Sequence, residues 1–559
     1  MRVDLMTLLV VALRVILADV GLRDGNQALK QPMNRGKKQV YFDWLKKLGI
    51  RAVELGFPAA DPEDAKIVAE LAAQAVPGMT VGALAMATES HIRIAGEALA
   101  TAPAGVTKRI HTFISTWPHA MQHSLGKSPE AVREMAIESV RLARSLVGPT
   151  NDVQFSPEHF GDCWDNLNWV IEVLRDVVAA CANVINLPNT VERSMPWRFV
   201  EMVRRVDEAL DDDLIISIHN HNDLGMATAT SLMATAVNPN RRWQIECTLN
   251  GTGERAGNTS LQEVAIALML HGVQTGINFE RIYEASLAVA DLLDMPISPK
   301  APHIGREVTV QRSGIHQKGA GVTQERNVDP AYLAYRPERI GRPPQDFEFT
   351  PQSGYFGVMQ VVLSTGETIS ETEARVLQPA LKATANQHPK LTAEEIVAVL
   401  YAYRELTEKK TVEAADIEAL AKDVISRMRG SQYWRLVRAY FNSSSSGKAS
   451  CQLRLTHNST QFEDVALGDG PVNAAVNALS RITGLEIRVS NYQAAGVTAG
   501  SDAQGEVTLN VQINGGVFAG EGLDTDLNVA AVRAVINGIN KALEANHLDE
   551  SAPAASVGT

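Results

Sequence analysis

The sequence has few cysteines, no excess of positive charge and no long apolar run, and each absence narrows the classes of protein to consider. Only four cysteines occur, without a CxxC pair, which argues against a disulfide framework or a zinc knuckle and suits a reducing cytoplasm. The formal net charge is −12, so no basic surface is expected that could neutralise a nucleic-acid backbone. We therefore expect a cytoplasmic protein without a nucleic-acid partner.

The most apolar stretch near the beginning of the sequence does not predict a membrane segment. Leu5–Leu17 is short, is interrupted by Arg14 and lacks a small-residue cleavage site. We expect a lead-in followed by a buried strand, rather than a signal peptide or a membrane span.

Residues 14–272 alternate short apolar runs with segments of helical spacing, such as Lys37–Leu48, Pro129–Leu146 and Leu167–Ala180. Eight repeats of this length predict an α/β fold, the (β/α)₈ or TIM barrel. An open doubly wound sheet is the competing fold, and the lack of GxGxxG after the first run disfavours it. The runs expected to form strands are Arg14–Val20, Arg51–Phe57, Thr80–Ala85, Arg109–Ser115, Asp152–Ser156, Asn183–Pro188, Leu214–Ile218 and Trp243–Leu249.

The segment after the barrel changes from an irregular to a helical pattern. Phe279–Leu293 continues as a helix, and residues 295–345 are rich in Pro, Gly and Arg, which predicts an irregular connector. Leu377–Arg429 is helical in pattern, with Thr392 as the expected N-cap of Ala393–Leu406.

The last part of the chain predicts an α+β module. In Glu506–Ile513 apolar and polar residues alternate, Asn514–Gly516 has the composition of a hairpin turn, and Val529–Leu543 has helical spacing. Asn442–Gly447 resembles a flexible linker in front of this module. We expect four parts, namely a barrel at 1–290, linker and helical subdomains at 291–430, an α+β domain at 431–548 and a disordered tail at 549–559.

Two histidines at the end of the seventh run predict a metal site. His219 and His221 share one face of a strand, ~6.5–7 Å apart, at the barrel end where such folds place active sites. Arg23 and Asp24 end the first run, and Asp24 could complete a His₂-carboxylate face. Arg23 could bind a carboxylate or stabilise an alkoxide.

The eighth run ends in a glycine-rich loop, Asn250–Asn258, which is expected at the same mouth of the barrel. Its glycines would let the backbone approach a ligand closely, and Glu254, Arg255 and Asn258 add polar groups there. A plain turn is the alternative for this loop.

These three motifs together resemble the superfamily of 2-isopropylmalate, citramalate and homocitrate synthases, metal-dependent condensing barrels related to the HMG-CoA lyases. The resemblance is strongest to the long type of 2-isopropylmalate synthase and covers nearly the whole chain. Further matching segments are Val53–Pro58, Arg109–Phe113, Phe155–Glu158, Asn186–Glu192, Ser313–Gln317, Gln352–Gly354, Gly468–Ala474, Gly496–Ala503 and Gly520–Asp526.

The resemblance implies an acyltransferase that joins the acetyl group of acetyl-CoA to 2-oxoisovalerate, giving 2-isopropylmalate and CoA in the first committed step of leucine biosynthesis. It implies a divalent metal, Mg²⁺ or Mn²⁺ with Zn²⁺ as an alternative, and K⁺ as a further option. The metal ligands would be Asp24, His219, His221 and, directly or through water, Asn258.

The resemblance also implies roles for residues around the metal. Arg23 would stabilise the alkoxide, while Glu158 and His316 would transfer protons at the acetyl methyl group. His316 lies beyond the barrel, in a segment that reaches the partner subunit's active site in relatives. The residues expected to line the oxo-acid pocket are Glu54, His111, Thr190 and Glu254.

For the C-terminal domain the resemblance implies dimerisation and inhibition by leucine, with dimerisation alone as the alternative. The expected partner is a second copy of the chain, with no nucleic acid and no membrane involved. The residues assigned to regulation are Tyr335, which could also lie near the active site, and Gly496, Asp502 and Ala503.

The chain departs from the family pattern at three places. Gly21 replaces an acidic residue, Lys318 follows His316-Gln317 where relatives carry Asp, and Tyr355 stands where a lysine is usual. The metal set is intact, so these departures bear on substrate choice and CoA contacts. Condensation on pyruvate or 2-oxoglutarate, a carbon–carbon lyase and a non-catalytic regulatory relative stay open as alternatives.

Overall fold

The computed structural model describes residues 14–344, 347–386, 391–409, 414–430, 433–443, 447–457, 460–496, 505–513, 515–524 and 526–546. The expected lead-in before residue 14, the tail at 549–559, Asp502, Ala503 and parts of the turns at 442–447 and 514–516 lie outside these residues. The chain forms two compact units, one up to Gln360 and one from Val361, so the division into four parts stays a prediction.

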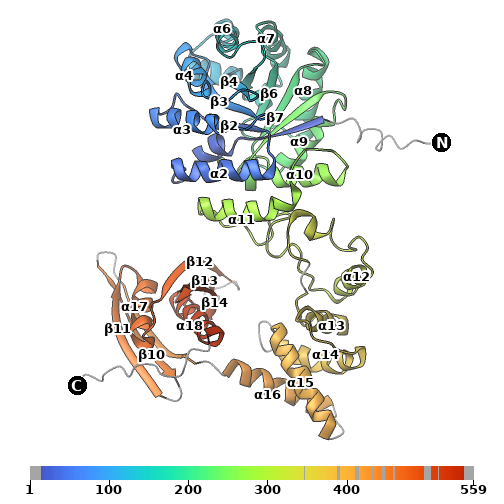
Figure 1. Ribbon diagram of the computed structural model, residues 1–559, viewed down its shortest axis with the longest axis vertical. Helices are drawn as coiled ribbons and strands as arrows, with labels where there is room; N and C mark the ends of the chain where they lie inside the picture. The colour runs from blue at the N-terminus through green and yellow to red at the C-terminus, as the bar shows by residue number, and fades with distance from the viewer. Residues whose placement is uncertain are drawn as a thin grey trace, which may run out of the picture. The chain divides into compact units, whose positions relative to one another are not determined.

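The first unit contains a closed barrel of eight parallel strands, which confirms the predicted fold (Figure 1). Each strand pairs with the next, and β1 closes the ring on β8 from Arg14↔Arg242 to Asp19↔Cys247. The strands are β1 (Arg14–Asp19), β2 (Ala52–Gly56), β3 (Thr80–Met86), β4 (Thr107–Ser115), β5 (Asp152–Glu158), β6 (Val184–Asn189), β7 (Ile215–Asn220) and β8 (Arg242–Cys247).

Helices surround the barrel, and their first turns carry the capping residues that the sequence supplies. Asn34 accepts a hydrogen bond from the Lys37 amide at the start of α2, and Ser128 does the same for Ala131 before Pro129 at the start of α6. The helices are α2 (Arg35–Leu48), α3 (Pro62–Ala73), α4 (Glu89–Leu99), α6 (Pro129–Val147), α7 (Leu167–Ala179), α8 (Pro196–Ala209), α9 (Ala227–Thr235) and α10 (Leu261–Leu270).

The hydrophobic core joins strands to helices, whereas the inside of the barrel is polar. Ile110 of β4 and Val140 of α6 are both fully buried in this core. Inside the barrel, the guanidinium of Arg109 donates to Gln154 at 3.2 Å and to Gln244 at 2.6 Å. Because the interior of the barrel is polar, charged side chains can lie inside it as far as the carboxyl ends of the strands without being buried in an apolar layer.

The segment after the barrel is less irregular than expected. α11 (Ile282–Leu293) is followed by α12 (Gly314–Glu325), a short 3₁₀ turn at Pro337–Ile340 and α13 (Tyr355–Ser364). The prediction of an irregular connector was wrong for α12, because its glycines serve close packing rather than helix breaking. A Cβ on Gly319 would lie 2.4 Å from the Tyr332 ring, and one on Gly321 would lie 2.4 Å from the Phe356 ring.

The second unit begins with α14 (Glu371–Ala385), α15 (Ala393–Lys409) and α16 (Ala414–Gly430). The backbone amide of Glu395 donates to the Thr392 hydroxyl at 3.3 Å, which confirms the predicted N-cap of α15. The helical pattern expected for this region is therefore confirmed.

The rest of the second unit repeats one arrangement twice, three antiparallel strands followed by a helix, which confirms the α+β prediction. One core contains residues of both halves. Each of the described helices is too short or too polar to cross a lipid bilayer. The elements are β9 (Arg435–Asn442), β10 (Ala449–His457), β11 (Thr460–Gly468), α17 (Pro471–Thr483), β12 (Arg488–Gly496), β13 (Gly505–Ile513), β14 (Gly516–Asp524) and α18 (Leu527–Asn546).

Candidate active site

A cavity of about 270 Å³ opens at the carboxyl ends of the barrel strands. Its polar residues come from different strand ends, as expected for a (β/α)₈ barrel. The residues that line it are Arg23, Asp24, Gln27, Phe57, Leu84, His111, Phe113, Ser156, Glu158, Asn186, Pro188, Thr190, His219, His221, Glu246, Glu254 and Arg255.

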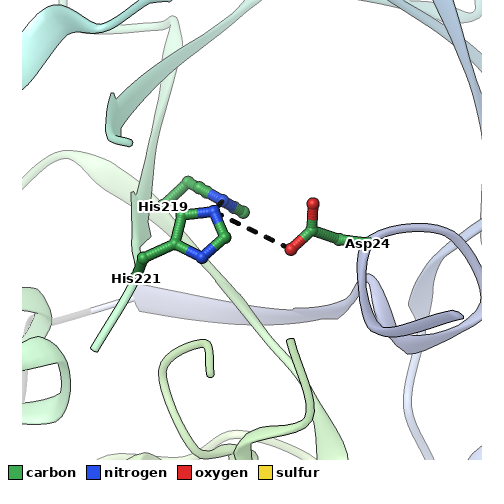
Figure 2. A group of neighbouring side chains, drawn as sticks. All are labelled: Asp24, His219 and His221. Atoms are coloured by element: carbon green, nitrogen blue, oxygen red, sulfur yellow. Dashed lines mark hydrogen bonds and ion pairs between the residues drawn. The ribbon is translucent and has the colours of Figure 1, made fainter. Parts of the chain in front are cut away.

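Asp24, His219 and His221 converge in this cavity (Figure 2). One ligand atom from each residue lies within 4.8 Å of the other two, and all three side chains are buried. The two histidine Nε2 atoms are 3.2 Å apart, and His221 Nε2 is 3.9 Å from Asp24 Oδ2. Two imidazoles and a carboxylate at these separations form a donor set typical of a divalent metal site.

An unpartnered polar atom beside these three side chains fits a metal ion. Among the described residues, the buried Oδ1 of Asn258 has no hydrogen-bond partner. Asn258 Nδ2 donates to Asp24 Oδ2 at 2.6 Å, so this amide lies at the edge of the carboxylate. A carbonyl oxygen without a partner is what a fourth ligand, or a residue holding a ligand water, would offer.

Arg23 and Asp24 lie in a tight turn, Gly21–Gly25, directly after β1. The guanidinium of Arg23 contacts Asp24 Oδ1 and Glu54 Oε2, each at 2.5 Å. Burial alone would raise the pKa of Asp24, but the charges of Arg23 and both histidines hold this pKa well below its usual value. Asp24 is therefore ionised at neutral pH and could donate a carboxylate oxygen to a metal ion.

Gly21, a departure from the family pattern, is explained by its neighbours. A Cβ at this position would lie 2.1 Å from the hydroxyl oxygen of Tyr41, which donates to Asp19 at 3.2 Å. The space that a side chain would need is filled by the tyrosine. A residue with a side chain would therefore clash with Tyr41 at this position.

A continuous hydrogen-bond network supports the floor of the cavity. Glu54 binds His111 Nδ1 at 2.6 Å, and His111 Nε2 binds the Ser156 hydroxyl at 2.7 Å. Asn186 Nδ2 joins Ser156, at 2.9 Å, to Glu246, at 3.3 Å. The network fixes the orientation of groups that face the cavity.

Glu246 is a site residue that sequence reasoning missed. Its Oε2 atom lies 2.9 Å from His219 Nδ1, and its Oε1 atom accepts from Gln154 Nε2 at 2.6 Å. Burial would raise its pKa, but the hydrogen bond from His219 and the charge of His111 lower it to about 2. The only sequence signal was an isolated acid within an apolar strand.

Glu158 is the last residue of β5, Thr190 directly follows β6, and both line the cavity. Burial raises the pKa of Glu158, with a smaller lowering by the charge of His159. The Thr190 hydroxyl accepts from the His159 amide at 3.0 Å, and its carbonyl accepts from Arg255 at 2.7 Å. A half-buried carboxyl with a raised pKa is suited to accept a proton.

The structure brings together most of the predicted site residues. Arg23, Asp24, His111, Glu158, Thr190, His219, His221 and Glu254 line the cavity, while Glu54 and Asn258 lie directly behind it.

His316 and Tyr335 do not line this cavity. The ring of His316 is exposed and stacks on Tyr332, with 4.3 Å between the ring centroids. Tyr335 instead has its hydroxyl 2.9 Å from His303 Nδ1. Gly496 ends β12 in the second unit, where it pairs with Gly505.

Comparison with known proteins matches both parts of this architecture. Residues 14–289 match the HMGL-like family model, and residues 411–543 match the LeuA allosteric (dimerisation) domain. The barrel with its cluster of ionisable residues thus defines an enzyme of the HMGL-like class.

Among similar proteins, 2-isopropylmalate synthase 2 of Leptospira interrogans is 44% identical over 384 residues, 68% of this chain and 87% of that protein. The 2-isopropylmalate synthases of Heliobacterium modesticaldum and Pyrococcus furiosus are 33% and 32% identical, over 94% and 95% of this chain and 96% and 99% of theirs. The chain belongs to the 2-isopropylmalate synthase family, whose common chemistry is an acyl-transferring condensation.

Proposed function

We propose that the protein condenses acetyl-CoA with 2-oxoisovalerate to give 2-isopropylmalate and CoA, as a cytoplasmic enzyme of leucine biosynthesis. The observation that carries this proposal is the convergence of Asp24, His219 and His221 beside an apolar wall in one cavity. The relatives that match over nearly the whole chain are named for the same reaction.

The metal would be held by Asp24, His219 and His221, with Asn258 completing the set directly or through water. Mg²⁺ or Mn²⁺ is proposed, with Zn²⁺ as an alternative and K⁺ as an optional further ion. When bound, the ion supplies Lewis-acid polarisation of the keto group of the oxo acid.

The protein's own residues would transfer the proton and stabilise the charge that develops during the reaction. The carboxylate of Glu158 takes a proton from the acetyl methyl group, and the resulting carbon nucleophile forms a bond to the keto carbon. Arg23, fixed between Asp24 and Glu54, stabilises the negative charge that develops on the keto oxygen. The alkoxide takes up a proton, which balances the one that Glu158 removed. Water then cleaves the thioester, which releases CoA and makes the reaction effectively irreversible.

His316 has a proposed role that needs a second subunit. It lies on the exposed surface of α12 and does not line the cavity of its own chain. We assign it to proton transfer in the active site of the partner subunit of a homodimer.

The alkyl group of the oxo acid would rest on the apolar part of the cavity wall. Phe57, Leu84, Phe113 and Pro188 line this part, and Thr190, His111 and Glu254 supply polar groups nearby. A branched three-carbon isopropyl group suits an apolar wall better than the second carboxylate of 2-oxoglutarate would.

We assign leucine inhibition and dimerisation to the C-terminal domain. Gly496 ends β12, and together with Asp502 and Ala503, which follow it in the sequence, it is proposed for effector binding. The sheet of β9–β11 exposes large apolar side chains on its outer face, an arrangement typical of an interface. These side chains are Val437, Tyr440, Val465 and Leu467.

Release of free CoA, followed with a thiol reagent, tests the proposal. Acetyl-CoA, Mg²⁺ or Mn²⁺ and a panel of 2-oxo acids are supplied in turn. Fastest release with 2-oxoisovalerate supports the named substrate, whereas release only with pyruvate or 2-oxoglutarate keeps the reaction and replaces the substrate. No release, with metal bound, would favour a lyase or a non-catalytic regulator.

A further inference from the structure

A second cavity, of about 270 Å³, lies in the segment that follows the barrel, apart from the candidate active site. It is enclosed by the turn at 303–309 and the segment 332–342. Its lining residues are His303, Val308, Thr309, Tyr332, Leu333, Ala334, Tyr335, Pro337 and Arg342, none of which lines the active-site cavity.

Arg342 is the charged residue of this lining, and it is buried without a counter-ion. Arg342 is 6% exposed, and no carboxylate pairs with its side chain among the described residues. Its guanidinium donates to the carbonyl of His303 at 3.2 Å and to that of Arg306 at 3.1 Å, and it stacks over Tyr283. These two contacts use only part of the N–H donors of the guanidinium, and neutral carbonyl groups do not neutralise the charge of a buried cation.

The other polar groups of the cavity are neutral hydrogen-bonding groups. Burial lowers the pKa of His303 and raises that of Tyr335 to about 12, so both are uncharged near neutral pH. The two are joined by a hydrogen bond of 2.9 Å between Nδ1 and the hydroxyl. His303 also has a φ of +68°, in the left-handed region that few non-glycine residues adopt.

Thr309 supplies an independent indication of a ligand. It lines the cavity, is 5% exposed, and its buried hydroxyl has no hydrogen-bond partner among the described residues. A buried hydroxyl without a partner costs free energy unless a bound molecule satisfies it. The remaining walls, which include Val308, Leu333 and Pro337, are apolar.

We propose that this cavity binds a small carboxylic acid with an apolar tail. The carboxylate would pair with the Arg342 guanidinium and accept a hydrogen bond from Thr309, while the tail would lie against Val308 and Leu333. A charged side chain, a hydroxyl without a hydrogen-bond partner and an apolar wall are together typical of a small-molecule binding site. Because the site uses no residue of the active-site cavity, it stands independently of the reaction proposed above.

The experiment uses the full chain with H219A and H221A in the presence of EDTA, so that the active site cannot hold the probe through a metal. Isothermal titration with 3-methylbutanoate should show one saturable site per chain. R342Q should weaken binding by at least ~10-fold, because it removes the charge-assisted pair. R339Q, a change of an exposed arginine on the neighbouring 3₁₀ turn, should leave the affinity unchanged.

T309V separates binding from folding, since R342Q also removes contacts to two carbonyls. Val keeps the shape of Thr and removes only a hydroxyl that has no partner, so the midpoint of thermal unfolding should not fall. Binding should nevertheless weaken several-fold. The proposal is overturned if 3-methylbutanoate does not bind, if R342Q and T309V bind it as tightly as their parent, or if inorganic phosphate binds more tightly.

Discussion

The Nδ1 atom of His219 lies 2.9 Å from Oε2 of Glu246, and the two residues stand side by side on β7 and β8. A hydrogen bond from Nδ1–H to the carboxylate leaves the Nε2 lone pair to face His221 and Asp24. Such carboxylate–histidine pairs fix the tautomer and the orientation of a metal-binding imidazole. Glu246 is thus a positioning residue of the proposed metal centre.

We expect Glu246→Gln to weaken the binding of Mn²⁺ by ~10–100-fold, because the amide neither carries the charge nor fixes the imidazole as well. Calorimetric titration of the metal-free protein measures this directly. Glu172→Gln, an exposed change on α7, is the control and should bind Mn²⁺ as the original chain does. Equal affinities for Glu246→Gln and the control would contradict the positioning role.

The raised pKa of Glu158 predicts how kcat/KM depends on pH on the acid side of its profile. Because burial raises its pKa above the usual value, the ionised base should be lost as pH falls through that raised pKa. In the original chain, kcat/KM should therefore rise with pH through an apparent pKa above the usual value of a glutamic acid.

Glu158→Gln should lower kcat by ~10²–10⁴-fold while Mn²⁺ affinity stays the same. The pH series of kcat/KM for both chains, with a metal titration, measures these effects. Retention of most of the activity, or an unchanged acid limb in the residual activity, would exclude Glu158 as the base.

Leu84 predicts a change of substrate preference. Its side chain lines the apolar part of the active-site cavity, so Leu84→Ala should make room for a longer alkyl chain. One added methylene is worth ~1–3 kcal/mol of discrimination. The ratio of kcat/KM for 2-oxo-4-methylpentanoate to that for 2-oxoisovalerate should therefore rise by ~10–200-fold. An unchanged ratio in a folded variant would place the alkyl group elsewhere.

Leucine should inhibit the full chain through the C-terminal domain. A chain that ends at residue 430 should keep condensation activity and lose its response to leucine, provided that circular dichroism shows a folded protein. Initial rates of CoA release over a leucine titration measure both properties. The same inhibition curve for both chains would move the effector site to the first unit.

The strands of the barrel were predictable because each apolar run lies between amphipathic segments of a different period. The convergence of His219 and His221 was predictable because they differ by two residues in a strand and therefore share a face. Both predictions depend on local spacing alone, which the sequence displays directly.

Other features depend on contacts between distant segments. Glu246 became a site residue only when β7 and β8 were in register, and α12 was hidden by glycines that make room for the rings of Tyr332 and Phe356. The pairing of Tyr335 with His303, rather than with the active site, depends on a turn whose geometry no local pattern revealed.

The most direct test of the account is the product formed from [2-¹³C]acetyl-CoA and 2-oxoisovalerate, observed by NMR with Mn²⁺-loaded protein after removal of the metal by chelation at the end of the reaction. The proposed reaction gives 2-isopropylmalate labelled in its methylene carbon, and none is expected from protein treated with EDTA beforehand or from Asp24→Ala. Product formed equally well without metal, or no product from fully loaded protein, would contradict it.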